Sequence, residues 1–162
     1  MNHVETVGLI SDTHDHLPSI ERAVALFNEH DVDLVLHAGD VVSPFTARAF
    51  SGLHAPFIGI FGNNDGDRVH LQQFFADIGT FHGDPYMDVI GGARVAVTHV
   101  PELASSLAVT HDVVVYGHTH ESVVEDNDAL VVNPGECCGY LSGRHTVAVL
   151  CIPDRRADII EL

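Results

Sequence analysis

The first half of the chain alternates short apolar runs with stretches of helical spacing. Apolar runs that predict buried strands lie at residues 7–10, 34–36 and 57–61. Helices are expected over residues 18–27, 44–50 and 67–77, the first two opened by proline. Val69, Phe74 and Phe75 are expected to form the apolar face of the third helix. This alternation indicates parallel strands covered by helices.

The second half is richer in strands. A hairpin is expected where residues 86–90 and 94–98 flank Gly91-Gly92, followed by a short helix over residues 102–108. Further strands are predicted at residues 113–116, 129–132, 146–151 and 157–160. Together the halves predict an α/β fold, a layered sandwich of two sheets packed face to face with helices outside. Neither a linker nor a repeat divides residues 1–162, so we expect a single domain.

The charge balance changes the expected environment of the protein. The chain has 23 acidic residues against 7 basic ones, all arginine, and a formal net charge of −16. Molar salt shortens the screening length to about 3 Å and removes most of the resulting self-repulsion. We therefore expect adaptation to a salt-rich (halophilic) cytoplasm, the alternative being a merely acidic soluble protein.

Charge and cysteine usage also restrict the partners and the compartment. The arginines are dispersed, with only Arg155 and Arg156 adjacent, so we expect no stable nucleic-acid partner. Three cysteines, two of them adjacent, do not make a disulfide framework and fit a reducing interior. No signal peptide is recognisable, and no apolar run approaches the roughly 20 residues of a membrane span. A cytoplasmic protein without a membrane partner is the expectation.

Potential metal ligands follow nearly every predicted strand. They are Asp12, His14, Asp40, Asn63, His99, His118 and His120. Strand ends deliver side chains to one rim of a sheet, so ligands that are distant in sequence can converge there. Oxygen and imidazole donors suit Mn, Fe, Ni, Co or Zn, and the lack of cysteine in the set argues against a purely structural zinc.

Each motif taken singly has a second interpretation. If the chain stays extended through Asp12-Thr13-His14, both outer side chains point the same way and chelate one ion; otherwise Asp12 caps a turn. The two oxygens of Asp40 suit a bridge between two cations, or a helix cap. Asn63 offers an amide oxygen within what is also a good turn sequence. His37 either supports the site or is a satisfied strand histidine.

The remaining donors have similar alternatives. His99 follows a predicted strand and would otherwise be an ordinary loop residue. His118 and His120 repeat the two-residue spacing of the first motif, which favours ligands over core histidines. Asp15 and Asp65 are candidates for orienting metal-bound imidazoles, the alternative being solvated loop carboxylates.

The ordered motifs resemble those of the calcineurin-like metallophosphoesterases. The matching pieces are Asp12-x-His14, Gly39-Asp40, Gly62-Asn63-Asn64-Asp65, His99 and Gly117-His118-x-His120. The small size and residues 133–140 are similar to the compact YfcE-type phosphodiesterases, particularly archaeal members. The resemblance implies a four-layer α/β/β/α fold and frequent homo-oligomers. It also implies two divalent metal ions, with Mn²⁺ or Ni²⁺ supporting activity.

The resemblance further implies a distribution of ligands and a reaction. One metal would be held by Asp12, His14 and His120, the other by Asn63, His99 and His118, with Asp40 as the bridge. A small phosphodiester would be hydrolysed by a hydroxide bridging the two metals.

Two departures from the family pattern bear on that reaction. Asn64 replaces a histidine thought to protonate the leaving group, and it has only an amide to offer a phosphate oxygen. Val100 replaces a common glycine and narrows the expected substrate opening. Rival interpretations are a catalytically weak protein-binding scaffold of the same fold and a nuclease.

Overall fold

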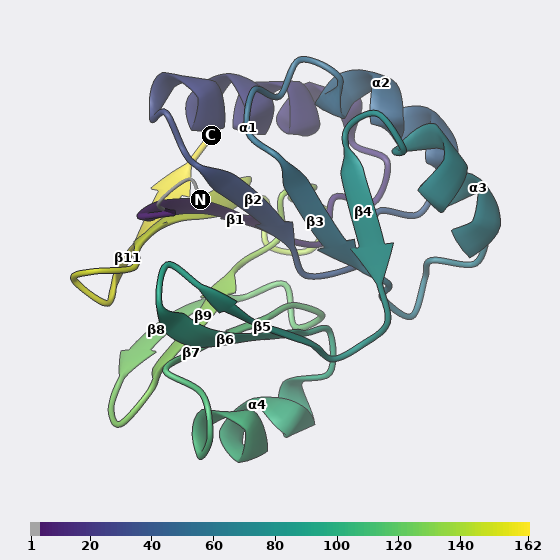
Figure 1. Ribbon diagram of the computed structural model, residues 1–162. Coiled ribbons are helices and arrows are strands. Elements are labelled where there is room, and N and C mark those ends of the chain that lie inside the picture. The colour runs from purple at the N-terminus through teal and green to yellow at the C-terminus, as the bar shows by residue number, and fades with distance from the viewer. Residues whose placement is uncertain (1–3) are drawn as a thin grey trace.

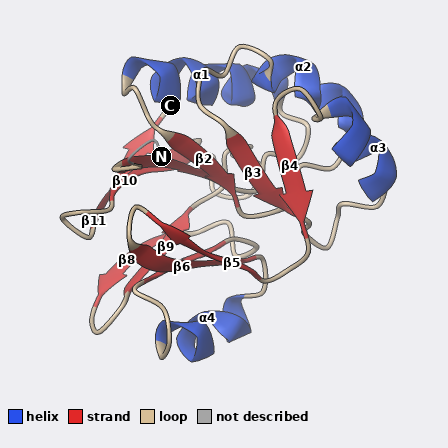
Figure 2. Ribbon diagram, viewed as in Figure 1, coloured by secondary structure: helices blue, strands red, loops and turns tan. Residues whose placement is uncertain are grey.

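Two β-sheets lie face to face in the computed structural model, which describes residues 4–162, and helices cover the outer face of each sheet (Figures 1 and 2). The order of layers is therefore helix, sheet, sheet, helix. This confirms the α/β/β/α sandwich expected from the sequence. Within the described residues every helix is too short or too polar for a bilayer crossing.

The first sheet contains the parallel strands of the N-terminal half and the last two strands of the chain. Its order is β11-β10-β1-β2-β3-β4; β1 to β4 are parallel, and β10 pairs antiparallel with both β1 and β11. The strands are β1 (Thr6–Ile10), β2 (Leu34–His37), β3 (Phe57–Ile60), β4 (Gly79–His82), β10 (Thr146–Cys151) and β11 (Arg156–Glu161).

The second sheet has the order β5-β6-β7-β9-β8. Its strands β6, β7 and β9 run parallel, and β5 and β8 pair antiparallel at the two edges. The bounds are β5 (Tyr86–Ile90), β6 (Ala93–Thr98), β7 (Val113–Tyr116), β8 (Ser122–Asp126) and β9 (Leu130–Pro134). The predicted hairpin over residues 86–98 is confirmed.

Helices of the N-terminal half cover the first sheet, and one helix covers the second (Figure 1). They are α1 (Leu17–Glu29), the 3₁₀ helix η1 (Pro44–Thr46), α2 (Ala47–Phe50), α3 (Arg68–Phe74) and α4 (Pro101–Ala108). Local sequence sets where they begin. The His16 ring accepts a hydrogen bond from the Ser19 amide before α1, and Asp67 caps α3 by accepting one from His70.

Apolar side chains fill each of the three spaces between the layers. Phe27, Phe50 and Phe57 pack between the first sheet and its helices. Leu9 and Val115 belong to the cluster between the two sheets, and a smaller cluster under α4 closes the outer face of the second sheet. Strands buried on both faces explain why the sequence shows continuous apolar runs.

Two features of the fold differ from the prediction. The third helix ends at Phe74, and Val69 and Phe74 are 63% and 57% exposed, so the predicted apolar face is wrong for these two residues and correct for the buried Phe75. Leu71 and Phe75, four residues apart, point into the core. Strands β4 and β8 were not predicted, because Phe81 is the only fully buried residue in β4 and β8 has none. Both are edge strands recognised only by their pairing.

Candidate metal centre

The seven predicted ligand residues converge where the carboxyl ends of parallel strands meet. Asp12, Asp40 and Asn63 follow β1, β2 and β3 of the first sheet, and His99 and His118 follow β6 and β7 of the second. Direct contacts join the two sheets at this point. The His99 ring bonds the Ala38 carbonyl at 2.7 Å, and the His118 amide donates to Asp12 Oδ2 at 3.0 Å.

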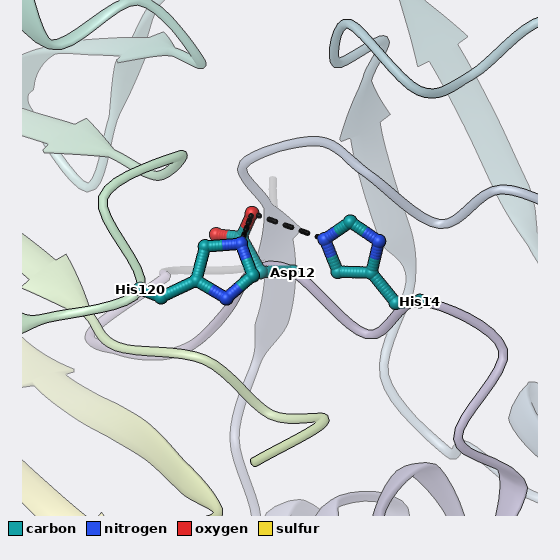
Figure 3. A group of neighbouring side chains, drawn as sticks. All are labelled: Asp12, His14 and His120. Carbon is teal, nitrogen blue, oxygen red and sulfur yellow. Dashed lines mark ion pairs between the residues drawn. The ribbon is translucent and has the colours of Figure 1, made fainter. Parts of the chain in front are cut away.

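Asp12, His14 and His120 form the first group of donor atoms (Figure 3). Asp12 Oδ1 lies 3.6 Å from His14 Nε2 and 3.4 Å from His120 Nε2. The carboxylate is held by its other oxygen, because Oδ2 accepts from the Ser11 hydroxyl at 2.7 Å as well as from His118. That arrangement turns Oδ1 toward the two imidazoles.

Asp40, Asn63, His99 and His118 form the second group. His99 Nε2 lies 3.3 Å from Asp40 Oδ2, 2.9 Å from Asn63 Oδ1 and 3.3 Å from His118 Nδ1. His118 Nδ1 also lies 3.0 Å from Asn63 Oδ1. One carboxylate oxygen, one amide oxygen and two ring nitrogens thus lie close together.

Asp40 stands between the two groups. Its Oδ2 atom is 3.4 Å from His14 Nε2 and 3.3 Å from His99 Nε2, so one oxygen is within reach of both sets of donors. Asn64 holds the carboxylate by donating its backbone amide to Oδ1 and its side-chain amide to Oδ2, each at 2.8 Å. The alternative that Asp40 caps a helix does not apply. Its two side-chain oxygens accept from Asn64 and not from the backbone amides of the residues that follow Asp40.

The residues fit a pair of divalent cations by two independent observations. Among residues 4–162, the buried side-chain polar atoms without a hydrogen-bond partner are Asp12 Oδ1 and His14 Nε2, both members of the first group. An unpaired buried polar atom is costly unless something binds it. Atoms that ligate one ion at 2.0–2.2 Å lie about 3 to 3.5 Å apart, which matches the separations in both groups.

Backbone conformation around the centre is unusual. Asp12, His14, Asp40, His118 and His120 all have positive φ, between 38° and 72°. Such values are uncommon for residues other than glycine and are concentrated at functional sites. The chain is therefore not extended through Asp12-Thr13-His14. The prediction that an extended backbone points the Asp12 and His14 side chains the same way is wrong. The turn itself brings both side chains together.

Gly39 is required by the close packing of the two sheets. It has φ of +96°, and a Cβ there would lie 2.7 Å from His99 Nδ1 and 2.9 Å from the Gly62 amide. A side chain at this position would push Asp40 and His99 apart.

The carboxylates give the centre a strongly negative field. Burial lowers the pKa of His99, but the hydrogen bond and charge of Asp40 outweigh it and raise that pKa to about 9. Hydrogen bonding to Asp12 likewise raises the pKa of His14. Burial opposes ionisation of Asp40, yet hydrogen bonds from His99 and Asn64 hold its pKa well below the usual range. A field that favours protons on imidazoles also favours a metal cation.

Glu136 is a residue of this centre that sequence reasoning missed. It is fully buried, and its carboxylate accepts from His120 Nδ1 at 2.6 Å. The Ser142 hydroxyl donates to it at 2.6 Å and the Leu141 amide at 3.0 Å. Since Nδ1 of His120 donates to Glu136, Nε2 is the ring nitrogen that faces Asp12. The only signal in the sequence was the family-like segment 133–140, which does not say which residue matters.

Glu136 also belongs to a third cluster of potential ligands, with His120 and Cys138. Burial raises the pKa of the Cys138 thiol to about 12, so the sulfur is protonated and donates to Glu136 at 3.3 Å. The Glu136 carboxylate thus accepts from both His120 and Cys138, and this cluster forms a hydrogen-bond network that supports His120.

Asp15 and Asp65 orient backbone instead of imidazoles, so that prediction is wrong. Asp65 is buried and accepts from the amides of Asp40, Val42 and Gly62 at 2.7–2.9 Å. Asp15 accepts from the Ser43 amide and hydroxyl. Neither is a solvated loop carboxylate. The two side chains shape the loop after β2 that carries Asp40.

His37 is buried in its strand and also supports the two loops that carry Asp12 and Asp40. Its Nδ1 accepts from the Gly39 amide at 3.1 Å, so Nε2 carries the proton and donates to the Thr13 hydroxyl at 3.1 Å. Burial lowers the pKa of His37 to about 3, which keeps the ring neutral. The ring ties the loop after β1 to the loop after β2.

The His37 ring gives an expected pH dependence of stability. Its folded pKa lies below the unfolded value of 6.5, so its contribution is present above pH 6.5 and is lost as pH falls toward 3. In urea unfolding between pH 7 and 5, wild-type stability should fall more steeply than that of His37→Gln, by up to about 1.4 kcal/mol per pH unit. Parallel curves for the two proteins would contradict this assignment.

Comparisons with known proteins agree with the fold and the motifs. The profile of the calcineurin-like phosphoesterase superfamily domain matches residues 6–155. A phosphodiesterase of Methanocaldococcus jannaschii is 45% identical over 152 residues, which cover 89% of this chain and 91% of that protein. The solved structure of an archaeal phosphodiesterase superposes with a TM-score of 0.91 at 40% identity, covering 97% of this chain and 99% of that one.

A more distant structure shows the same fold. It is that of Yfce, a phosphoesterase from E. coli, with a TM-score of 0.69 at 19% identity, covering 96% of this chain and 98% of that one. The profile match spans nearly the whole chain, and the matched segment contains every residue of the two donor groups. The chain therefore belongs to the calcineurin-like phosphoesterase superfamily and is a hydrolase of phosphoric esters.

Proposed function

We propose that the protein is a binuclear-metal-dependent phosphodiesterase acting on small phosphodiesters. The observation that carries the proposal is the position of Asp40 Oδ2, within 3.4 Å of a donor in each group. The similarity to an archaeal phosphodiesterase over most of both chains supports the substrate class.

Two groups of side chains would hold the metals. Asp12, His14 and His120 would hold one ion, Asn63, His99 and His118 the other, and Asp40 both. When bound, two such ions supply Lewis acidity toward the phosphoryl oxygens and a water of lowered pKa as nucleophile. Mn²⁺ or Ni²⁺ are the ions we propose, and the same donors accept Fe, Co or Zn.

The side chains of this protein perform the positioning. Hydrolysis forms one P–O bond to water, breaks one P–O ester bond and leaves the water's proton to the departing alcohol. Asn64 keeps the Asp40 carboxylate in place with one amide hydrogen, and its other hydrogen remains for a phosphoryl oxygen. No histidine stands at this position to protonate the leaving group, so diesters with good leaving groups are the preferred substrates.

Metal analysis together with a diester assay tests the proposal. Purified protein should bind about two Mn²⁺ per chain and hydrolyse bis-p-nitrophenyl phosphate, and a chelator should abolish both. As a control, the Asn127→Asp variant, whose change lies between β8 and β9 and outside both donor groups, should bind Mn²⁺ and hydrolyse the diester like wild type. Stoichiometric metal without turnover would instead favour a protein-binding scaffold, and cleavage of oligonucleotides in preference to small diesters would favour a nuclease.

The acidic surface leads to an expected salt dependence. With a formal charge of −16, self-repulsion opposes the compact state in dilute buffer and is screened in molar KCl. The unfolding temperature and the diesterase activity should both rise between 0.1 and 3 M KCl. A thermal melt that is the same at the two concentrations would remove the proposal of salt adaptation.

A further inference from the structure

A pocket of about 290 Å³ adjoins the second donor group. Asn63, His99 and His118 of that group line it, together with Phe61, Arg68 and Val100 among others. The volume is at the lower end of the about 300–1,000 Å³ of small-molecule sites, so it suits one substituent of a substrate. Val100, which is expected to narrow the substrate opening, lines this pocket and is 41% exposed.

Arg68 lies on the wall of this pocket as an exposed residue with a hydrogen bond and an aromatic contact. Its Nε donates to the Asp65 carbonyl at 3.1 Å, and its guanidinium carbon lies 5.0 Å from the centre of the Phe61 ring. Phe61 in turn stacks on Phe81 at 5.1 Å with an interplanar angle of 13°. A guanidinium supported in this way presents a flat, preorganised surface.

The partners of Arg68 differ from those of most arginines in the chain. Arginines 94, 144, 155 and 156 each pair with a carboxylate. Within residues 4–162, no carboxylate lies at ion-pair distance from Arg68, although the protein is strongly acidic. Its terminal nitrogens therefore remain available to a bound molecule.

The charge of the pocket indicates what kind of group it accepts. Asp84 and Glu102 also line the pocket, so two carboxylates stand against the single guanidinium. A second phosphate is disfavoured by that balance and by the net charge of the protein. Apolar Val100 and Pro101 favour a neutral group with an apolar face.

We infer that Arg68 is a specificity-determining residue that binds a flat, uncharged aromatic ester group of the phosphodiester. The inference rests on the proposed function, since the phosphate itself would sit beside the adjoining donor group. Phe61 fixes the guanidinium, and the aromatic group stacks on or beside it. Diesters with only small alkyl groups leave this pocket unused.

Calorimetric binding of unreactive diesters to the Mn²⁺-loaded protein tests the inference. Wild type should bind diphenyl phosphate at least about tenfold more tightly than dimethyl phosphate. Arg68→Ala should reduce that preference by about three- to tenfold, the range of a cation–π contact, and leave dimethyl phosphate binding unchanged. Arg48→Ala is the matched control, because Arg48 also lies over an aromatic ring, Phe45, but outside the pocket.

Three outcomes would overturn the inference. One is a wild type that does not distinguish the two diesters, and another is an Arg68→Ala variant that keeps the full preference. Tighter binding of methylenediphosphonate than of either diester, lost in Arg68→Ala, would assign Arg68 to a second phosphate. If Mn²⁺ binding and bis-p-nitrophenyl phosphate hydrolysis stay intact in these cases, only the subsite is wrong. Absence of Mn²⁺ binding by wild type would overturn the proposed function, and the subsite with it.

Discussion

Replacing Asp40 by asparagine is expected to lower diesterase activity by about 1,000-fold or more, the upper end of the cost of removing one preorganised electrostatic group. Asp40 Oδ2 lies within 3.4 Å of donors in both groups, so the change removes charge from both ion positions at once. In the wild type the Asn64 side-chain amide donates to Asp40 Oδ2, so the amide introduced in the variant faces another amide group. Steady-state kinetics with bis-p-nitrophenyl phosphate and metal content by mass spectrometry are the measurements.

The control for this variant is Asp158→Asn. Asp158 is an exposed carboxylate on β11 that pairs with Arg156, so the change in charge is equal and the donor groups are untouched. Thermal melts of both variants separate a loss of fold from a loss of the centre. If Asp40→Asn retains two metals and more than a tenth of wild-type activity, Asp40 is not the shared ligand.

Replacing Glu136 by glutamine is expected to weaken metal binding about 10- to 100-fold, the usual effect of losing a partner that orients a ligand. The change acts through His120, whose Nδ1 donates to the carboxylate at 2.6 Å and so directs Nε2 toward Asp12. Glutamine has one acceptor oxygen in place of two, and the donors of Leu141 and Ser142 already compete for it. The ion at Asp12, His14 and His120 should be lost first on titration with a chelator.

A loss of stability accompanies that change and has to be separated from it. A buried amide left without an acceptor costs about 1–3 kcal/mol, so the unfolding temperature of Glu136→Gln should also fall. Metal affinity measured at 10 °C, where the variant is folded, isolates the effect on the ligand. Glu161→Gln, which removes a surface carboxylate paired with Arg144, is the matched control. A variant with lower stability and unchanged affinity would make Glu136 a purely structural residue.

The candidate ligands were predictable because of how parallel strands are built. Asp12, Asp40 and Asn63 each follow an apolar strand whose carboxyl end lies at the same edge of the first sheet. His99 and His118 follow strands that end at the corresponding edge of the second sheet. Position after a strand is visible in the sequence, and in this fold it is nearly equivalent to position in space.

The supporting residues were less predictable because burial and partners decide their role. Asp65 lies in a glycine-flanked turn, where the sequence alone is compatible with an exposed carboxylate. In the structure this carboxylate accepts hydrogen bonds from three backbone amides. Glu136 is separated from His120 by two strands, β8 and β9, and no spacing rule connects the two residues. Edge strands β4 and β8 were missed for a related reason, since their formation depends on pairing with a neighbour.

The layered α/β class and the candidate donor residues could be predicted from the sequence, because apolar periodicity and the residues that follow each strand are local properties of the chain. The division of these donors into two groups, the place of Asp40 between them, and the positions of Glu136 and Arg68 beside them are visible only in three dimensions. Those relations depend on how the two sheets stack and on left-handed backbone turns at Asp12 and His120. Such turns are held by packing and hydrogen bonds from distant segments, which no local pattern specifies.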